Sequence, residues 1–221
     1  MKTNTLLVFA ALIIFAIASS SILVSAPSIK ETRKDAAWEI AVDSIPRNLD
    51  EFKAMRDSLA SSPQGAMVVY LVAHLILKDN PTLGQQCLII SLDMSQLVKA
   101  SAGSKFAEVE GWTFGSSEGY KLNMSTFNRS KSYVANSYVK GTSTEQGYKL
   151  PGLPYKYTVT KHGYQDADPD VWKGMVRTSC NDQGYVPIQV KKNSRGVWKV
   201  FNSSGFYSGC KAPKTDDGDE L

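Results

Sequence analysis

The most constraining feature of this sequence is the stretch from residue 171 to residue 212, which has the pattern of several short strands. Runs rich in β-branched and aromatic residues alternate there with Gly, Asn and Ser turns, as in consecutive antiparallel strands. Two of the three cysteines, Cys180 and Cys210, lie in this stretch and would be close together in a meander. We therefore expect a disulfide between Cys180 and Cys210 that braces the last part of a β-sheet.

The first half of the chain carries the signals of three helices joined by tight turns. Asn48 is a good N-cap residue with Glu51 three positions later, so an amphipathic helix should begin there. Ser62-Pro63 and Asn80-Pro81 each combine an N-cap with a first-turn proline, which predicts a second and a third helix. Residues 66–77 of the second helix are apolar nearly all round, which indicates that this helix is central and buried.

Strand character follows these helices. The pattern predicts a short fourth helix at 122–133, a hairpin turn at 193–196, and strands at 133–140, 155–161, 171–178, 186–192 and 197–201. Residues 35–42 read as a weak helix, and residues 94–120 as a loop or an irregular strand pair. Helices followed by strands predict an α+β fold, with three to four N-terminal helices packed on a C-terminal antiparallel β-sheet.

One form of this fold is a cone like that of nuclear transport factor two, with a pocket between a helix and a curved sheet. His74, Tyr157 and Trp172 would then be pocket walls, or else ordinary core residues. His74 has no histidine or carboxylate four positions away to share a metal, which favours a hydrogen-bonded core residue. Cys87 lies in an apolar helical pattern and should be a buried small hydrophobe.

Residues 1–26 have the pattern of a secretory signal peptide. Lys2 precedes an apolar run at 6–24, and a small-residue cleavage site ends at Ala26. The run is also long enough to cross a bilayer, so an uncleaved membrane anchor is the alternative. The rest of the chain divides into a lead-in segment at 27–45, a single α+β domain at 46–213 and an acidic disordered tail at 214–221.

The other end of the chain also carries a secretory feature. Gly218–Leu221 ends in Asp-Glu-Leu, as the retrieval signals of the endoplasmic reticulum do, although Gly218 replaces their basic residue. Asn123, Asn128 and Asn202 are in N-x-S/T sequons, which accept glycans in a eukaryotic secretory pathway. We expect a protein that is secreted or retained in the lumen of the endoplasmic reticulum, with a membrane-anchored form as the alternative. Both compartments favour disulfides.

Four segments of the chain resemble a known family. They are 52–66, 138–151, Val176–Ser179 (Val-Arg-Thr-Ser) and Gly196–Val200 (Gly-Val-Trp-Lys-Val). The family consists of bacterial, often exported, proteins classed as a domain of unknown function, and the resemblance spans about residues 46 to 213. It implies a shared fold and brings no activity with it.

Few groups in the sequence suggest catalysis or metal binding. His162 precedes Asp166, Asp168 and Asp170, which have the spacing of the first ligands in a calcium loop. The glycine and the glutamate that complete such a loop are missing, so a solvated acidic turn is the simpler interpretation. Ser179 could be a nucleophile, but the chain has only two histidines and no G-x-S-x-G, H-E-x-x-H or P-loop pattern. We predict no catalytic residue, no metal site and no cofactor.

Residues 147–155 form a segment rich in Pro, Gly and Tyr. Tyr148, Pro151, Pro154 and Tyr155 are a candidate binding loop at a sheet edge, or part of a rigid crossover that seals the core. The net charge is only +4, and the basic residues are spread along the chain, so nucleic acid is not an expected partner. We predict a non-enzymatic binding protein whose partner is a protein, a glycan or a small apolar ligand. The alternative is a hydrolase or isomerase with a pocket between helices and sheet.

Overall fold

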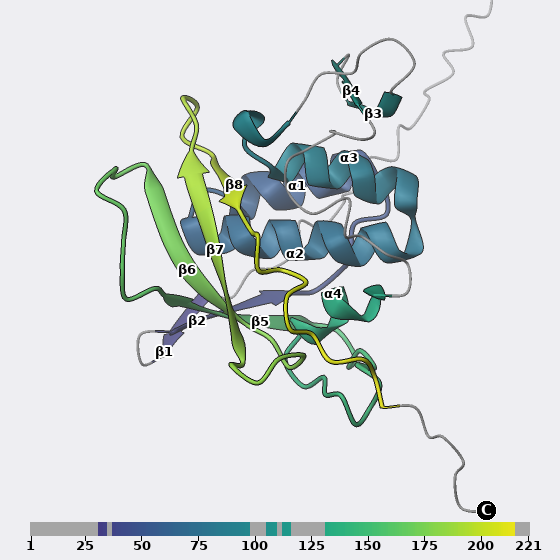
Figure 1. Cartoon of the computed structure of the whole chain (residues 1–221). Coiled ribbons are helices and arrows are strands. Elements are labelled where there is room, and N and C mark those ends of the chain that lie inside the picture. Colours follow the sequence, from purple (N-terminus) through teal and green to yellow (C-terminus); the bar gives the residue numbers. More distant parts are fainter. Residues whose placement is uncertain (1–30, 35–36, 98–104, 110–111, 116–130, 215–221) are drawn as a thin grey trace, which may run out of the picture.

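The computed structural model describes residues 31–34, 37–97, 105–109, 112–115 and 131–214. Figure 1 shows the long helices on one side of a strongly twisted sheet, with a small strand pair, β3 and β4, beside α3. Among the described residues, no helix combines the length and apolar character needed to cross a bilayer. The elements in chain order are β1 (Glu31–Lys34), β2 (Ala37–Val42), α1 (Leu49–Leu59), α2 (Pro63–Asp79), α3 (Pro81–Ser91), a 3-10 turn (Met94–Gln96), β3 (Lys105–Val109), β4 (Trp112–Gly115), α4 (Tyr133–Ser137), β5 (Tyr155–Lys161), β6 (Val171–Arg177), β7 (Tyr185–Lys192) and β8 (Trp198–Asn202).

Six strands form one antiparallel sheet in the order β1-β2-β5-β6-β7-β8. The last three strands form the predicted meander, and the turn at 193–196 joins β7 to β8. The outer edge of β8 is covered, because the Trp198 N–H donates to the carbonyl of Ala60 and the Asp93 N–H donates to that of Val200. The α+β prediction is confirmed, and the cone-shaped form of it stays a prediction.

The helix α2 is the buried centre of the fold. Every residue from Gln64 to Leu77 is buried. The helix packs against α1, α3 and α4, and it also contacts β2, β6, β7 and β8 of the sheet. The prediction of a central helix is therefore confirmed.

Each of the three long helices begins at its predicted cap. The Asn48 side chain accepts a 2.9 Å hydrogen bond from the Glu51 N–H, and the Glu51 carboxylate accepts one from the Arg47 N–H. Ser62 caps α2 by accepting from Gly65, and Asn80 caps α3 by accepting from Leu83. These bonds satisfy N–H groups that the helix itself leaves without partners.

The segment before the helices is a strand, so the weak helix predicted at 35–42 is wrong. In β2 the side chains of Trp38 and Ile40 lie opposite Val159 and Tyr157 of β5. Alternate side chains of a strand point to the same face, and Ile40 is buried there. Pairing with β5 stabilises this segment as a strand where its own sequence gives only a weak signal.

The strand predicted at 133–140 is also wrong, because α4 occupies its first half. Val134 and Ala135 are buried, and α4 packs against α2. The Ser137 hydroxyl donates to the Val134 carbonyl at 2.7 Å, which closes a helical turn. Residues 122–130 of the predicted fourth helix lie outside the described residues.

The residues after β8 form a C-terminal segment, 203–214, which runs over α2 and past α4 (Figure 1). Ser203 Oγ lies 2.8 Å from the hydroxyl of Tyr70 on α2. The Tyr138 hydroxyl donates a 2.6 Å hydrogen bond to the Phe206 carbonyl. These bonds are buried, so they fix the course of the segment over the core.

His74 is part of the same contact between α2 and the C-terminal segment. Its Nδ1 lies 3.0 Å from the Tyr207 hydroxyl, and its ring stacks on Phe206 with centroids 4.2 Å apart. Its Nε2 is buried and has no hydrogen-bond partner within the described ranges of the chain. Burial lowers the pKa of His74 from 6.5 to about 3, so the ring is neutral in the folded protein.

The predicted disulfide is present. Cys180 and Cys210 are joined across a separation of 30 residues, and the Lys211 N–H donates to the Cys180 carbonyl at 2.7 Å. The disulfide therefore ties the C-terminal segment to the turn between β6 and β7. The third cysteine, Cys87, is fully buried, and burial raises the pKa of its thiol to about 12.

Removing the disulfide should destabilise the domain. For a closed loop of this length, chain entropy predicts that the C180S/C210S double variant loses about 3 to 4 kcal/mol of unfolding free energy. Urea unfolding of the oxidised wild type and of the variant measures the difference. Dithiothreitol should lower the stability of the wild type and leave the variant unchanged; equal midpoints for the two oxidised proteins would contradict the prediction.

Acidification should destabilise the domain through His74. Its pKa is lower in the folded state, so the unfolded chain takes up the proton first. The stabilisation is complete above pH 6.5 and is lost as the pH falls toward 3. Below the pKa of the unfolded chain, the free energy of unfolding should fall by up to about 1.4 kcal/mol for each pH unit of acidification. Urea titrations from about pH 7 to pH 5, where most carboxylates stay ionised, measure it. The H74F variant keeps a ring against Phe206 and should show a flatter pH dependence; equal slopes would rule His74 out as the cause.

Candidate functional site

The ladder between β5 and β6 ends early. The two strands pair at only three positions. The next pair in this register would place Thr158 opposite Arg177, and that pair is not formed. Because β2 stays paired with this part of β5, and β7 with this part of β6, the sheet opens between its two halves.

The chain between α4 and residue 142 crosses this opening. The Lys140 N–H donates to the carbonyl of Lys156 on β5 at 2.8 Å. At its other end, the Ser137 carbonyl accepts a 2.9 Å hydrogen bond from the N–H of Ser179, two residues beyond β6. Residues 137–142 therefore bridge the two halves of the sheet by backbone hydrogen bonds.

A cavity of about 510 Å³ lies at this opening; we call it the β5–β6 cavity. Its size is in the range of small-molecule sites. Its walls come from the bridging residues 137–142, from β5, and from the β6–β7 turn with the strand ends beside it. The polar residues that line it are Ser137, Tyr138, Lys140, Thr142, Thr158, Arg177, Thr178, Ser179 and Tyr185.

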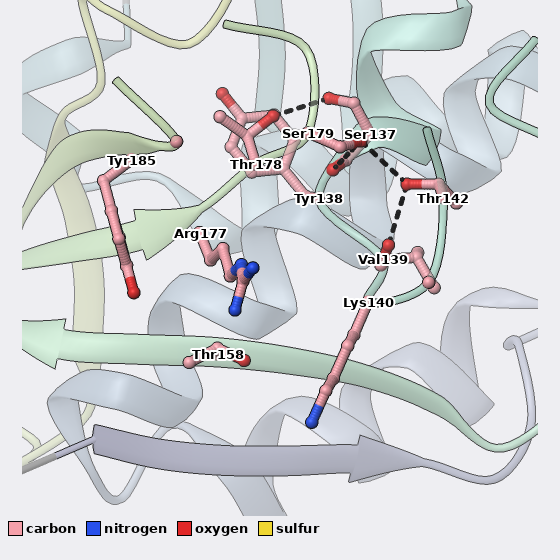
Figure 2. Close-up of a pocket in the computed structure, with 12 residues that line it drawn as sticks. Ser137, Tyr138, Val139, Lys140, Thr142, Thr158, Arg177, Thr178, Ser179 and Tyr185 are labelled. Carbon is pink, nitrogen blue, oxygen red and sulfur yellow. Dashed lines mark hydrogen bonds between the residues drawn. The ribbon is translucent and has the colours of Figure 1, made fainter. Parts of the chain in front are cut away.

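Four hydroxyl groups of the wall bond to the protein itself (Figure 2). Ser137 Oγ lies 2.8 Å from Thr178 Oγ1, and Thr142 Oγ1 lies 3.0 Å from Ser179 Oγ. Thr142 Oγ1 also lies 2.8 Å from the Val139 carbonyl oxygen, and Ser179 Oγ lies 3.1 Å from that of Ser137, so one of the two hydroxyls donates to its carbonyl and the other donates to its partner hydroxyl. These bonds join the bridging residues to the β6–β7 turn, so they hold the wall of the cavity in place.

The lysine of the cavity has an acidic partner outside it. Lys140 Nζ lies 2.5 Å from one carboxylate oxygen of Glu39, and Lys156 Nζ lies 3.6 Å from the other. The hydrogen bond from Lys140, together with the charges of both lysines, lowers the pKa of Glu39 against the opposing effect of desolvation. Because two lysines share one carboxylate, the cluster of Glu39, Lys140 and Lys156 keeps a net positive charge.

Three other polar side chains of the cavity have no such partner. Thr158, Arg177 and Tyr185 form no side-chain hydrogen bond and no ion pair with any other residue that the structure describes. Figure 2 shows the Arg177 guanidinium projecting toward Thr158, between Tyr185 and Lys140. These three groups can therefore bind an added molecule without breaking a bond inside the protein.

The two histidines and the acidic residues considered for catalysis or metal binding lie away from this cavity. His74 is in the core, and His162 Nδ1 bonds to the backbone of Tyr164. Asp166 and Asp168 each accept a backbone N–H two residues ahead, as in Asx turns. In the part of the chain that the structure describes, no three His, Cys, Asp or Glu residues are placed to hold a metal ion.

The other residues of the suggested pocket also lie in or near the core. Tyr157 is fully buried, and Trp172 is half-buried with its ring edge-on to Trp38. Ser179 lines the β5–β6 cavity, but its hydroxyl bonds to a carbonyl and to Thr142. Among the described residues, no histidine or carboxylate lines the cavity to activate it.

The candidate binding loop is partly buried. Tyr148 is fully buried, stacks on Tyr133, and donates from its hydroxyl to the Lys211 carbonyl at 2.9 Å. The exposed residues of the loop are Gly147, Lys149 and Pro151–Pro154. Tyr155 is half-buried and lines a separate groove of about 210 Å³, together with residues of α2 and α3.

Of the three sequons, only Asn202 is in the described part of the chain. It is half-buried at the end of β8, and its side-chain oxygen accepts the Ser204 N–H at 3.0 Å. Asn123, Asn128, the leader at 1–26 and the terminal Gly218–Leu221 lie outside the described residues. Glycosylation and retrieval stay predictions.

Apart from Ser179, sequence reasoning missed the residues that line the cavity. Lys140 and Arg177 do fall in two of the four segments that resemble a known family, 138–151 and 176–179. That resemblance indicated membership and gave no role to any residue. Thr158 and Tyr185 carry no signal of their own, because they are ordinary residues of a strand.

Comparison with known proteins confirms the family resemblance. A family model described as a domain of unknown function (DUF6935) matches residues 44–214, which include α1 to α4, β5 to β8 and each of the described residues that line the cavity. Neither a search of curated proteins nor a search of solved structures found a match. The chain therefore belongs to the family described as a domain of unknown function, DUF6935.

Proposed function

We propose that this domain is a non-enzymatic binding protein and that its ligand site is the β5–β6 cavity. The observation that carries the proposal is a cavity of about 510 Å³ with three polar side chains that lack a partner among the described residues. Its wall is fixed by hydrogen bonds, which lowers the cost of ordering the site when a ligand binds. These groups favour a small polar molecule as the ligand, whereas the sequence suggested a protein, a glycan or a small apolar ligand.

The hydrolase alternative has less support at this cavity. An activated serine needs a base within hydrogen-bond reach, and the base needs a group that orients it. Of the residues that the structure describes, the lining includes Ser179 but no histidine, aspartate or glutamate. The groups present are suited to holding a ligand rather than to moving its protons.

The proposal includes a location outside the reducing cytosol. The Cys180–Cys210 disulfide supports it, because such bonds persist in oxidising compartments. The apolar run at 6–24, followed by small residues before Pro27, supports export as well.

Mass spectrometry of the protein from its native host tests this location. The mature chain should begin at Pro27 and carry the Cys180–Cys210 disulfide. A chain that begins at Met1 and has both cysteines reduced would contradict export.

Blocking the cavity tests the proposed binding function. Thr158 lines the cavity, and tryptophan is well tolerated in strands, so the T158W variant should fold and fill much of the space. The matched control is T160W, two residues along on the same face of β5 and outside the lining. Circular dichroism and thermal unfolding establish that both variants fold.

Ligand-observed NMR against a library of water-soluble metabolites gives the readout. Wild type and T160W should share a set of binders, and T158W should lose them. If the library has no binder, or if folded T158W keeps every one, the β5–β6 cavity is not the ligand site.

A further inference from the structure

The charged groups at the β5–β6 cavity are unbalanced. Lys140 and Arg177 line it, and no acidic residue in the described part of the chain does. The nearby carboxylate of Glu39 is shared between Lys140 and Lys156, so it leaves the charge of Arg177 uncompensated. A cavity with this balance attracts anions and disfavours cations.

Arg177 is held on a regular part of the sheet. It is the last residue of β6 and lies opposite Tyr185, the first residue of β7, so both side chains leave the same face. The guanidinium presents a planar fork of N–H donors that matches the two oxygens of a carboxylate or a phosphate. Within the described residues, no carboxylate occupies that fork.

Two hydroxyl groups extend the same recognition surface. Thr158 on β5 and Tyr185 on β7 lie on the two sides of the opening, and both line the cavity with Arg177. Each hydroxyl can donate to an oxygen of the ligand. The three groups come from three strands, so a ligand that meets all of them would span the opening in the sheet.

We infer that the β5–β6 cavity binds a small organic anion, whose carboxylate or phosphate group contacts Arg177 and whose remaining body lies against Thr158 and Tyr185. This inference rests on the proposed function of the cavity. A volume of about 510 Å³ is far more than one oxyanion group needs, so the ligand carries an organic body as well. The ring of Tyr185 offers that body an apolar surface beside its polar hydroxyl.

The test compares sugars that differ only in their anionic group. The probes are glucose, glucuronate and glucose 6-phosphate, titrated into the mature full-length domain and followed by heteronuclear NMR. Glucuronate and glucose 6-phosphate should bind, with shifts centred on the amides of Thr158, Arg177 and Tyr185, and glucose should bind at least about tenfold more weakly. Whichever charged sugar binds more tightly indicates whether the natural group is a carboxylate or a phosphate.

Two charge-neutralising variants assign the contact. R177Q should weaken both charged sugars by about tenfold or more, the loss expected for a charge-assisted pair. K173Q removes the same charge from the same face of β6, outside the cavity lining, and should change affinity by less than about twofold. Added salt should weaken binding to wild type more than binding to R177Q.

Several outcomes would overturn the inference. They are equal affinity for glucose and the charged sugars, no binding of either charged sugar, and equal losses in R177Q and K173Q. Each would remove the anion inference while the proposed function stands, provided that library ligands still bind wild type and T160W but not T158W. If the T158W experiment instead shows that the β5–β6 cavity is not the ligand site, both the proposed function and the anion inference are removed.

Discussion

The burial of α2 is the constraint on which the rest of the structure depends. A helix that is apolar on every side cannot face water on any of them, so the chain has to supply a partner for each face. The sheet covers one side through β2, β6, β7 and β8, and α1, α3 and α4 cover others. The C-terminal segment completes the cover, which explains why residues beyond the last strand are part of the folded core.

Polar groups within this core decide where the C-terminal segment lies. Tyr70 meets Ser203, and Tyr138 donates to the Phe206 carbonyl, so the segment has buried partners at defined positions. Beyond them, the segment reaches the β6–β7 turn through the disulfide at Cys180. That turn contributes Thr178 and Ser179 to the cavity wall, and the wall is therefore connected to α2 by a continuous series of contacts.

The sequence predicted those parts of the fold that local chemistry determines. The caps at Asn48, Ser62 and Asn80, the strands β5 to β8 and the disulfide all follow from signals within a few residues or from a single pattern. The two errors, at 35–42 and 133–140, concern segments whose structure is set by tertiary partners: β2 pairs with β5, and α4 packs on α2. The cavity was also missed because it depends on tertiary structure. It lies where the pairing between β5 and β6 stops, although each strand was predicted well.

The polar groups of the cavity form two sets, and their difference bears on function. The hydroxyls of Ser137, Thr142, Thr178 and Ser179 bond to one another and to carbonyls, so they stabilise the wall. Thr158, Arg177 and Tyr185 are held by strands instead, and they have no such bonds among the described residues. Leaving a buried donor without a partner destabilises a fold, but Arg177 is exposed to water and so carries little of that cost. A site of this kind keeps its donors in place before a ligand arrives. Because these donors are already in place, the small organic anion that we propose would bind with little further ordering of the site.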